Sequence, residues 1–359
     1  MRIGNSLRKR GLLVMRYILG IDSGGSKCDA LLVRDDGIAI GWGHTEFVSD
    51  PPRKRNFGGF GRNPRSVGGA VQQAIKGFTC DDLHIVGLMS YMPMDYLRES
   101  HFGDIHLHPT SETQGALALA GVDCGLVVLA GTGALVYGLT RDGKMLHLDG
   151  FGPMLGDYGS GFQIGALAVR AAAQAHWHPR HHTSLATTIF NALRARLGDG
   201  GIRGLVEFMG SERDRAEIAA LARIVDHEAR NGDAIAGAIM CQVAGNMAET
   251  VRDVVEGLGI TQEDYPMVGT GSVITRSDIY WEHLCARVAE FAPRLAPWRS
   301  DMPAVLGLVL VALNKLATVD APTLRENLFS SVRELMKYEP AESQPAKTHK
   351  QISKGVISL

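Results

Sequence analysis

Cysteine is scarce in this chain, and its few copies form no motif. The 359 residues contain five cysteines without any Cys-x-x-Cys pair: Cys28, Cys80, Cys124, Cys241 and Cys285. An odd and dispersed set predicts free thiols in a reducing cytoplasm. It also argues against an iron–sulfur cluster or a structural zinc site, for which closely spaced cysteines are typical.

Further absences narrow the classes of function. The formal net charge is −1, which gives no electrostatic reason to expect a nucleic acid as partner. No apolar run approaches the roughly 20 residues that span a bilayer, so no membrane partner is expected. Residues 1–14 have too short an apolar stretch for a secretory signal, and Met15 is a second candidate start. No helix-turn-helix segment precedes Tyr17, so a repressor role has no support.

Two segments, residues 17–42 and 125–148, follow the same pattern. Each predicts an apolar strand, a glycine turn with a hydroxyl, a second strand, an Asp-Gly turn and a third strand. Asp36-Gly37 and Asp142-Gly143 between apolar runs are strong hairpin signals. Glycine turns that carry hydroxyls let backbone N–H groups close around phosphate oxygens. We therefore expect a duplicated domain with phosphate held between the two copies.

The rest of the chain alternates between strands and helices, which indicates an α/β architecture. Its length suffices for two domains with filled cores. The periodicity predicts helices over 66–76 and 303–313, and a helical pair over 217–257 that breaks at Asn231-Gly232. It also predicts strands over 84–88 and 105–108, and a late strand with another glycine turn within 266–274.

The first glycine turn, Asp22-Ser-Gly-Gly-Ser-Lys27, ends a strand, where α/β proteins commonly bind ligands. A carboxylate beside a phosphate turn can hold Mg²⁺, because Mg²⁺ prefers oxygen ligands. A surface β-turn is the alternative interpretation of this segment alone. The Walker spacing is absent, so a nucleotide site here would be of another kind.

The second turn, Gly131-Thr132-Gly133, is a weak signal alone. It gains weight from residues 150–161, where glycines surround Asp157 and imply backbone packed closely against a ligand or another segment. A structural loop is the alternative for that stretch. His176, His178, His181 and His182 lie within seven residues, but a solvated loop is favoured over a metal site because no carboxylate stands at ligand spacing.

The motifs together resemble a known family. The segments Gly20-Ile-Asp22-Ser-Gly-Gly-Ser26-Lys27, Gly131-Thr-Gly-Ala134 and Gly150-Phe-Gly-Pro-Met-Leu-Gly-Asp157-Tyr-Gly-Ser160 are similar to those of the N-acetylglucosamine kinase group of the BadF/BadG/BcrA/BcrD ATPase family, within the sugar kinase–Hsp70–actin superfamily. The likeness covers residues 15–330. It implies an α/β fold of two ribonuclease H-like (actin-like ATPase) domains, with ATP and sugar in the cleft between them.

The resemblance also implies the division of the chain. The expected parts are an extension over 1–14, an N-terminal actin-like domain over 15–124, a C-terminal actin-like domain with a helical insertion over 125–302, a helix over 303–335 that returns to the first domain, and a disordered tail over 336–359.

The activity that the resemblance implies is Mg²⁺-dependent transfer of the ATP γ-phosphoryl group to the 6-hydroxyl of an amino sugar, of the N-acetylglucosamine or glucosamine type. The protein would be a cytoplasmic homodimer. Asp22 would organise Mg²⁺ and Glu112 would be catalytic. The residues expected to bind ATP are Asp22, Gly24, Gly25, Ser26, Lys27, Gly131, Thr132, Gly133, Gly271 and Ser272. Those expected to bind sugar are Asn63, Ala134, Gly150, Phe151, Gly152 and Asp157.

Several positions depart from the family pattern. Glu112 stands for an aspartate, Ala134 for a serine, Phe151 for a tryptophan and Tyr158 for a glutamate. A carboxylate misplaced by about 1 Å can lose on the order of 100-fold in rate. The alternative is therefore a catalytically weakened or inactive sensor of nucleotide or sugar. A stand-alone ATPase that activates a partner enzyme is disfavoured, because the cysteine spacing of such relatives is missing.

Overall fold

The computed structural model describes residues 15–24, 27–46, 64–87, 97, 103–178, 180–198, 201–210 and 215–336. Gly25, Ser26 and Asn63, which were predicted to bind ligands, lie outside the described residues. The expected extension over 1–14 and the tail beyond Met336 also lie outside them.

The first sheet contains the first of the two similar segments. Its strands are β1 (Tyr17–Ser23), β2 (Lys27–Arg34), β3 (Ala39–Glu46), β4 (Asp82–Gly87) and β5 (Asp104–Pro109), in the order β3-β2-β1-β4-β5. The first three strands pair antiparallel, whereas β4 and β5 run parallel to β1. Most residues of β1 and β2 are buried, because helices cover both faces of the sheet.

The second sheet repeats this topology. Its strands are β6 (Gly125–Ala130), β7 (Ala134–Leu139), β8 (Met145–Asp149), β9 (Pro266–Thr270) and β10 (Ala296–Arg299), in the order β10-β9-β6-β7-β8. Again three strands pair antiparallel and the last two run parallel to the first. The expected duplication and the α/β fold class of two actin-like units are therefore confirmed. The residue limits of the domains stay a prediction.

Both Asp-Gly turns form as expected. Gly37 donates its N–H to the carbonyl of Arg34 at 2.9 Å, and Gly143 donates to Thr140 at 3.0 Å. Both glycines have φ near +85°, at +88° and +84°. Each turn joins the second and third strands of its sheet, as the sequence pattern predicts.

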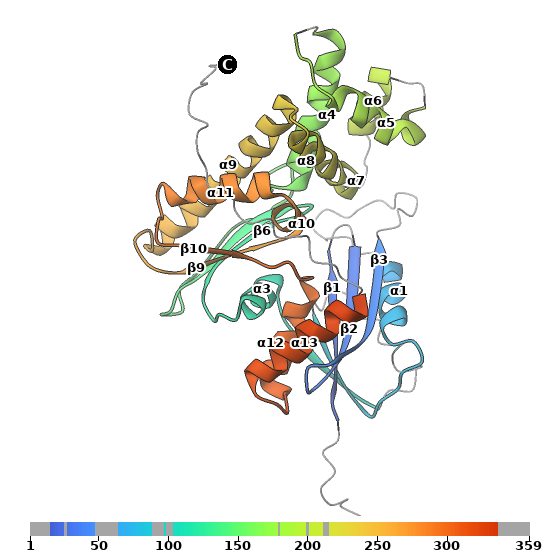
Figure 1. Ribbon diagram of the computed structural model, residues 1–359, viewed down its shortest axis with the longest axis vertical. Helices are drawn as coiled ribbons and strands as arrows, with labels where there is room; N and C mark the ends of the chain where they lie inside the picture. Colours follow the sequence, from blue (N-terminus) through green and yellow to red (C-terminus); the bar gives the residue numbers. More distant parts are fainter. Residues whose placement is uncertain are drawn as a thin grey trace, which may run out of the picture.

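Helices cover both faces of the first sheet (Figure 1). On one face α1 (Pro64–Ala74) packs on residues such as Leu19 and Ile21. On the other, α12 (Val305–Leu316) and α13 (Ala321–Met336) bury Ile18 and Leu31, so the expected buried helix near the C-terminal end is confirmed. α9 (Ala234–Leu258) and α11 (Asp278–Ala289) pack together beside the second sheet.

Five of the helices that lie between β8 and β9 in the sequence gather at the end of the molecule away from α12 and α13 (Figure 1). They are α4 (Gly161–Trp177), α5 (Leu185–Leu197), α6 (Gly201–Gly210), α7 (Arg215–Ala220) and α8 (Ala222–Arg230). The expected break at Asn231-Gly232 separates α8 from α9, but a further break at Leu221 was not predicted. None of the described helices is long and apolar enough to cross a membrane. None of the five cysteines forms a disulfide, in line with the prediction of thiols.

The late strand and glycine turn expected within 266–274 both form. The strand is β9, which ends at Thr270, and α10 (Ser272–Arg276) follows it directly. Gly271 forms the turn between them with φ +88°, a backbone conformation that residues other than glycine adopt at a cost. The short helix over Val273 and Ile274 was not predicted.

Helix α3 (Glu112–Ala120) contacts both sheet-centred units. Its buried Ala116 and Leu117 pack on Val127 of β6 and Val268 of β9 in the second sheet. On its other side it crosses α12 closely, because a Cβ on Gly307 would lie only 2.1 Å from the carbonyl oxygen of Gly115. The first residue of this helix is Glu112.

Candidate functional site

The predicted ligand residues follow the carboxyl ends of parallel strands. Asp22 is near the end of β1, and Glu112 follows β5 in the same sheet. Gly131 follows β6, and Gly271 follows β9 in the second sheet. Strands that run parallel end at the same edge of their sheet, where α/β proteins bind ligands. The topology therefore gathers these residues at one edge of each sheet.

The turn between β1 and β2 has a row of polar side chains at its base. Asp22 faces Asp29 across the β1–β2 pair, and Asp29 faces His44 across the β2–β3 pair. Directly opposed residues of antiparallel strands place their side chains on one face. The buried Asp29 carboxylate lies 2.5 Å from Lys27 Nζ and 2.6 Å from His44 Nδ1. Asp29 therefore fixes the direction of the Lys27 side chain.

Sequence reasoning missed Asp29, whereas it named Gly24 as a phosphate contact. The amide of Gly24 donates to the carbonyl of Lys27 at 3.0 Å, so this N–H closes the turn instead of facing a ligand. Asp29 carried no sequence signal beyond its place two residues after Lys27. Its role depends on the strand register, which places the Asp29 carboxylate, 1% exposed, next to the side chains of Lys27 and His44.

The turn between β6 and β7 is fixed to the start of α4. Gly131 donates its N–H to Gly133 at 2.9 Å, and its carbonyl accepts from Gly161 at 2.8 Å. The Thr132 carbonyl accepts from Phe162 at 3.3 Å. The amides of Thr132 and Gly133 make no hydrogen bond to another described residue. These two N–H groups, and not that of Gly131, are thus available to an anion.

Gly271 lies against the same strand end. A Cβ at this position would be 2.4 Å from the carbonyl oxygen of Ala130, so no side chain fits. Its carbonyl accepts from the Thr275 hydroxyl at 3.0 Å, which closes the first turn of α10. The structure therefore brings Gly271 and Ser272 beside the second phosphate turn, as the duplicated topology requires.

Asp149, which sequence reasoning also missed, closes the glycine-rich loop over residues 150–158. Its Oδ1 accepts the N–H of Gly150 at 2.7 Å and of Asp157 at 2.6 Å, and its Oδ2 accepts the N–H of Tyr158 at 2.8 Å. Asp149 itself has φ +71°, and Asp157 has φ +58°. Non-glycine residues in this region carry strain that concentrates at functional sites.

Asp157 connects this loop to the second turn. Its carboxylate is buried and its Oδ1 accepts the N–H of Ala134 at 3.3 Å. A Cβ on Gly133 would lie 3.0 Å from the same oxygen. Burial raises the pKa of this carboxyl, whereas the Ala134 amide lowers it by a smaller amount. The structure thus brings together Gly133, Ala134 and Asp157.

Two other predicted sugar-binding residues lie further out on the loop. The Phe151 side chain is 72% exposed. Gly152 has φ +85° and a Cβ there would meet the Arg215 guanidinium of α7 at 2.8 Å. Phe151 therefore does not share the buried position of Asp157 in this structure.

Glu112 is positioned by the cap of α3. Ser111 is the N-cap, and its hydroxyl accepts the Gln114 N–H at 3.1 Å while the Gln114 side chain accepts the Ser111 N–H at 3.2 Å. This reciprocal arrangement is a capping box. It places the half-buried Glu112 in the first turn, where the helix dipole favours a carboxylate.

A duplicated mixed sheet, with glycine turns and carboxylates at the strand ends, defines an actin-like ATPase fold. The chain belongs to the BadF/BadG/BcrA/BcrD ATPase family, whose model matches residues 19–290.

Relatives of known name support this placement. The chain is 29% identical over 208 residues to an N-acetyl-D-glucosamine kinase of Dictyostelium discoideum, an alignment that covers 57% of this chain and 62% of the relative. It is 28% identical over 158 residues to an N-acetylmuramic acid/N-acetylglucosamine kinase of Clostridium acetobutylicum, covering 44% of this chain and 51% of that protein. The chain thus spans less than two thirds of the length of either relative.

A solved structure shows the same fold. The provisionally assigned N-acetylglucosamine kinase of Chromobacterium violaceum superposes with a TM-score of 0.56 at 20% identity, over 83% of this chain and 99% of that one.

Proposed function

We propose that the protein phosphorylates the 6-hydroxyl of an amino sugar at the expense of ATP. The observation that carries the proposal is the gathering of acidic residues and glycine turns at the carboxyl ends of parallel strands in two sheets of identical order. Membership of an ATPase family supports the use of ATP. The two relatives, which are named as kinases of N-acetylglucosamine, support an amino sugar as acceptor.

On the nucleotide side, the chain offers oxygen donors and a cation. Asp22 gives carboxylate oxygens of the kind that suits Mg²⁺, and the neighbouring Asp29 orients Lys27. When bound there, Mg²⁺ would neutralise charge on the transferring phosphoryl group. Lys27 and the amides of Thr132 and Gly133 would contact phosphate oxygens. Gly24 and Gly131 would shape the turns, and Gly25 and Ser26 stay predicted phosphate contacts.

Near the adenosine, Gly271 and Ser272 would let the nucleotide approach the backbone closely. On the acceptor side, the loop closed by Asp149 would hold the sugar through Gly150, Phe151, Gly152 and Asp157. Ala134 would line the same place, and Asn63 stays a predicted contact.

Glu112 would act as the general base. Its carboxylate would take the proton of the sugar hydroxyl as that oxygen attacks the γ-phosphorus. The bond from the γ-phosphorus to the bridging oxygen breaks, and ADP leaves with the electron pair. A base positioned for such a transfer contributes about 10²- to 10⁴-fold.

A panel of amino sugars in a coupled ADP-release assay tests the proposal. We expect Mg²⁺-dependent ADP release with at least one amino sugar and none with ATP alone. Glu112→Gln keeps the shape of the side chain and should lower kcat by about 10²- to 10⁴-fold. The control Glu263→Gln alters an exposed side chain, 52% accessible, and should leave kcat unchanged. ADP release that is indifferent to every amino sugar would refute the kinase proposal.

Calorimetry with the same sugars separates weak catalysis from none. Binding without turnover would identify an inactive sensor. The expected homodimer stays a prediction, which light scattering during size-exclusion chromatography tests.

A further inference from the structure

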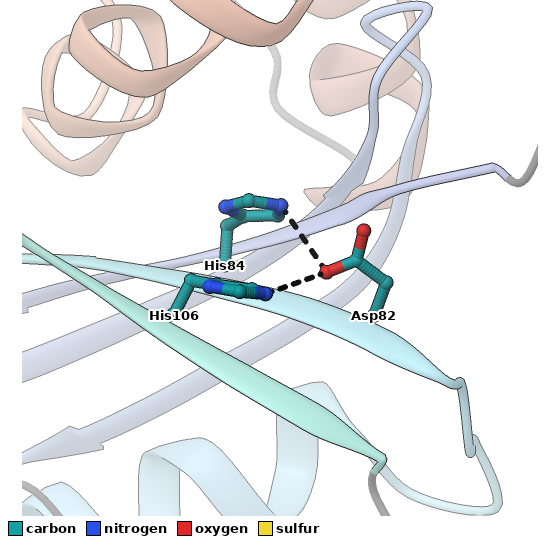
Figure 2. Close-up of side chains that lie close together, drawn as sticks. All are labelled: Asp82, His84 and His106. Atoms are coloured by element: carbon teal, nitrogen blue, oxygen red, sulfur yellow. Dashed lines mark ion pairs between the residues drawn. The ribbon is translucent and has the colours of Figure 1, made fainter.

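A cluster of three metal-ligating side chains lies on the first sheet, apart from the residues proposed for catalysis. Asp82 and His84 belong to β4, and His106 belongs to the neighbouring strand β5. The parallel register pairs His84 with His106, so both rings lie on the same face of the sheet. Figure 2 shows the two rings lying nearly parallel, each with a nitrogen toward the Asp82 carboxylate.

The distances within this cluster suit a bound ion. Asp82 Oδ1 lies 3.3 Å from His84 Nε2 and 3.3 Å from His106 Nε2. One ligand atom from each of the three residues lies within 4.8 Å of the others. Ligands held at about 2.0–2.2 Å by one tetrahedral zinc ion are separated by about 3.3–3.5 Å. The spacing is therefore close to that of a zinc shell.

Two of these atoms are buried without a hydrogen-bond partner. Asp82 Oδ1 and His84 Nε2 are both inaccessible to solvent, and despite their short separation neither makes a hydrogen bond within the described part of the chain. The His84 side chain is 9% exposed. An unpaired buried polar atom costs about 1–3 kcal/mol, so a pair of them on facing groups needs an explanation.

The contact with His108 determines which nitrogen of His84 is available to a metal ion. His84 Nδ1 lies 2.8 Å from His108 Nε2, so one of these two nitrogens carries the shared proton. If His84 Nδ1 donates it, His84 Nε2 presents a lone pair to the Asp82 oxygen, and only a cation between them makes that approach favourable. A second ring nitrogen that donates to a neighbour is the usual support of a metal-bound histidine.

We propose that Asp82, His84 and His106 bind a zinc-type divalent transition-metal ion, with His108 as the positioning residue of His84. Two imidazoles and one carboxylate are a donor set for zinc, and they leave the fourth position to water. Mg²⁺ is excluded as the preferred occupant because it favours oxygen ligands. His106 is 52% exposed, which gives the ion a path from solvent.

The ion would fasten the edge strand β5 to β4. β5 pairs only with β4 among the described strands, and Glu112 follows β5 after two residues. The site would therefore stabilise the segment that precedes α3. It is independent of the proposed kinase activity, since none of its ligands is a proposed contact of ATP or sugar.

Cobalt titration of the chelator-treated full chain tests the proposal. We expect one equivalent of Co²⁺ to give the intense visible bands of a tetrahedral site, and Zn²⁺ to displace it. His106→Ala, on an exposed edge position, should abolish the bands. His108→Ala should retain one equivalent but weaken the affinity by about 10- to 100-fold and shift the bands, as expected for a residue that orients a ligand.

His181→Ala is the matched control, because His181 belongs to the exposed histidine group near the end of α4. This variant should bind Co²⁺ like the parent. Parent protein without tetrahedral bands, or bands lost in His181→Ala and kept in His106→Ala, would overturn the proposal. Should His106→Ala melt at a much lower temperature than the metal-free parent, Asp82→Asn provides the second variant with the same expected loss.

Discussion

Replacing Asp149 by alanine tests how the glycine-rich loop is held. This carboxylate accepts three backbone N–H groups, from Gly150, Asp157 and Tyr158. Alanine removes both acceptor oxygens and all three hydrogen bonds at once, whereas asparagine keeps one oxygen and also tolerates the positive φ of +71°. The pair of variants therefore separates the charge and its hydrogen bonds from backbone strain.

The size of the effect follows from the exposure of the three donors. The Asp157 residue is 5% exposed, so its amide cannot find water while the loop keeps its shape. Tyr158 is 53% exposed, and its amide can exchange a protein acceptor for solvent. A hydrogen bond to a charged acceptor contributes about 1.5–3 kcal/mol when desolvated. The bond to the Asp157 amide counts fully and the other two count in small part. Their loss should therefore lower the free energy of loop opening by about 2–4 kcal/mol.

This free energy corresponds to about a 30- to 1,000-fold change in the opening equilibrium. Hydrogen exchange at the amides of Asp157 and Tyr158 measures it directly, and both should exchange faster in Asp149→Ala by up to this factor. Asp149→Asn should fall between the parent and the alanine variant. If the loop binds sugar as proposed, KM for sugar should rise while KM for ATP changes little. Unaltered exchange at both amides in Asp149→Ala would refute the reasoning.

Three further changes have expected outcomes that urea unfolding can check. Gly259→Ala, at φ +71° in open space, should lower the free energy of unfolding by about 1–2 kcal/mol. Gly271→Ala should lower it clearly more, because its Cβ would also strike Ala130. Equal losses would contradict the close approach of Gly271 to Ala130. Arg325→Ala removes two hydrogen bonds to carbonyls in the last turn of α3, at 3.0 and 2.6 Å, and should lower the free energy of unfolding by about 1–3 kcal/mol. Arg325→Lys should fall between this variant and the parent. An unchanged stability would show that α3 needs no such cap. Burial raises the pKa of Asp157 in the folded protein, so the penalty for its charge is absent at low pH and grows as the pH rises above about 4. The stability of Asp157→Asn relative to the parent should therefore increase as the pH rises through that range. A difference that does not depend on pH would refute this prediction.

The sequence predicted those parts of the fold that depend on local signals. The Asp-Gly pairs at 36–37 and 142–143 demand a positive φ and a tight turn, so the two antiparallel units were visible without any structure. The buried run over 303–313 was equally clear because it is apolar on all sides. The end of β9 was not, since Val273 and Ile274 are good strand residues and only the backbone of Gly271 turns them into a helix.

Within the candidate site, prediction succeeded for the turns and failed for the residues that hold them. Asp29 acts through a partly buried ion pair, and Asp149 acts through backbone N–H groups. Neither contact follows from sequence spacing. The metal cluster depends on the register of two parallel strands, which places His84 opposite His106, 22 positions further along the chain. Only pairing in space makes such residues neighbours. The roles of the predicted ligand residues stay predictions.

Helix α3 couples the relative movement of the two sheets to the position of Glu112. It packs on β6 and β9 through Ala116 and Leu117, and on α12 through the glycine crossing at Gly115. No rotation of one sheet against the other can leave this helix in place relative to both. Any hinge motion that accompanies ligand binding would therefore change the direction of Glu112 at the same time. The angle between the domains and the orientation of the Glu112 carboxylate cannot change independently.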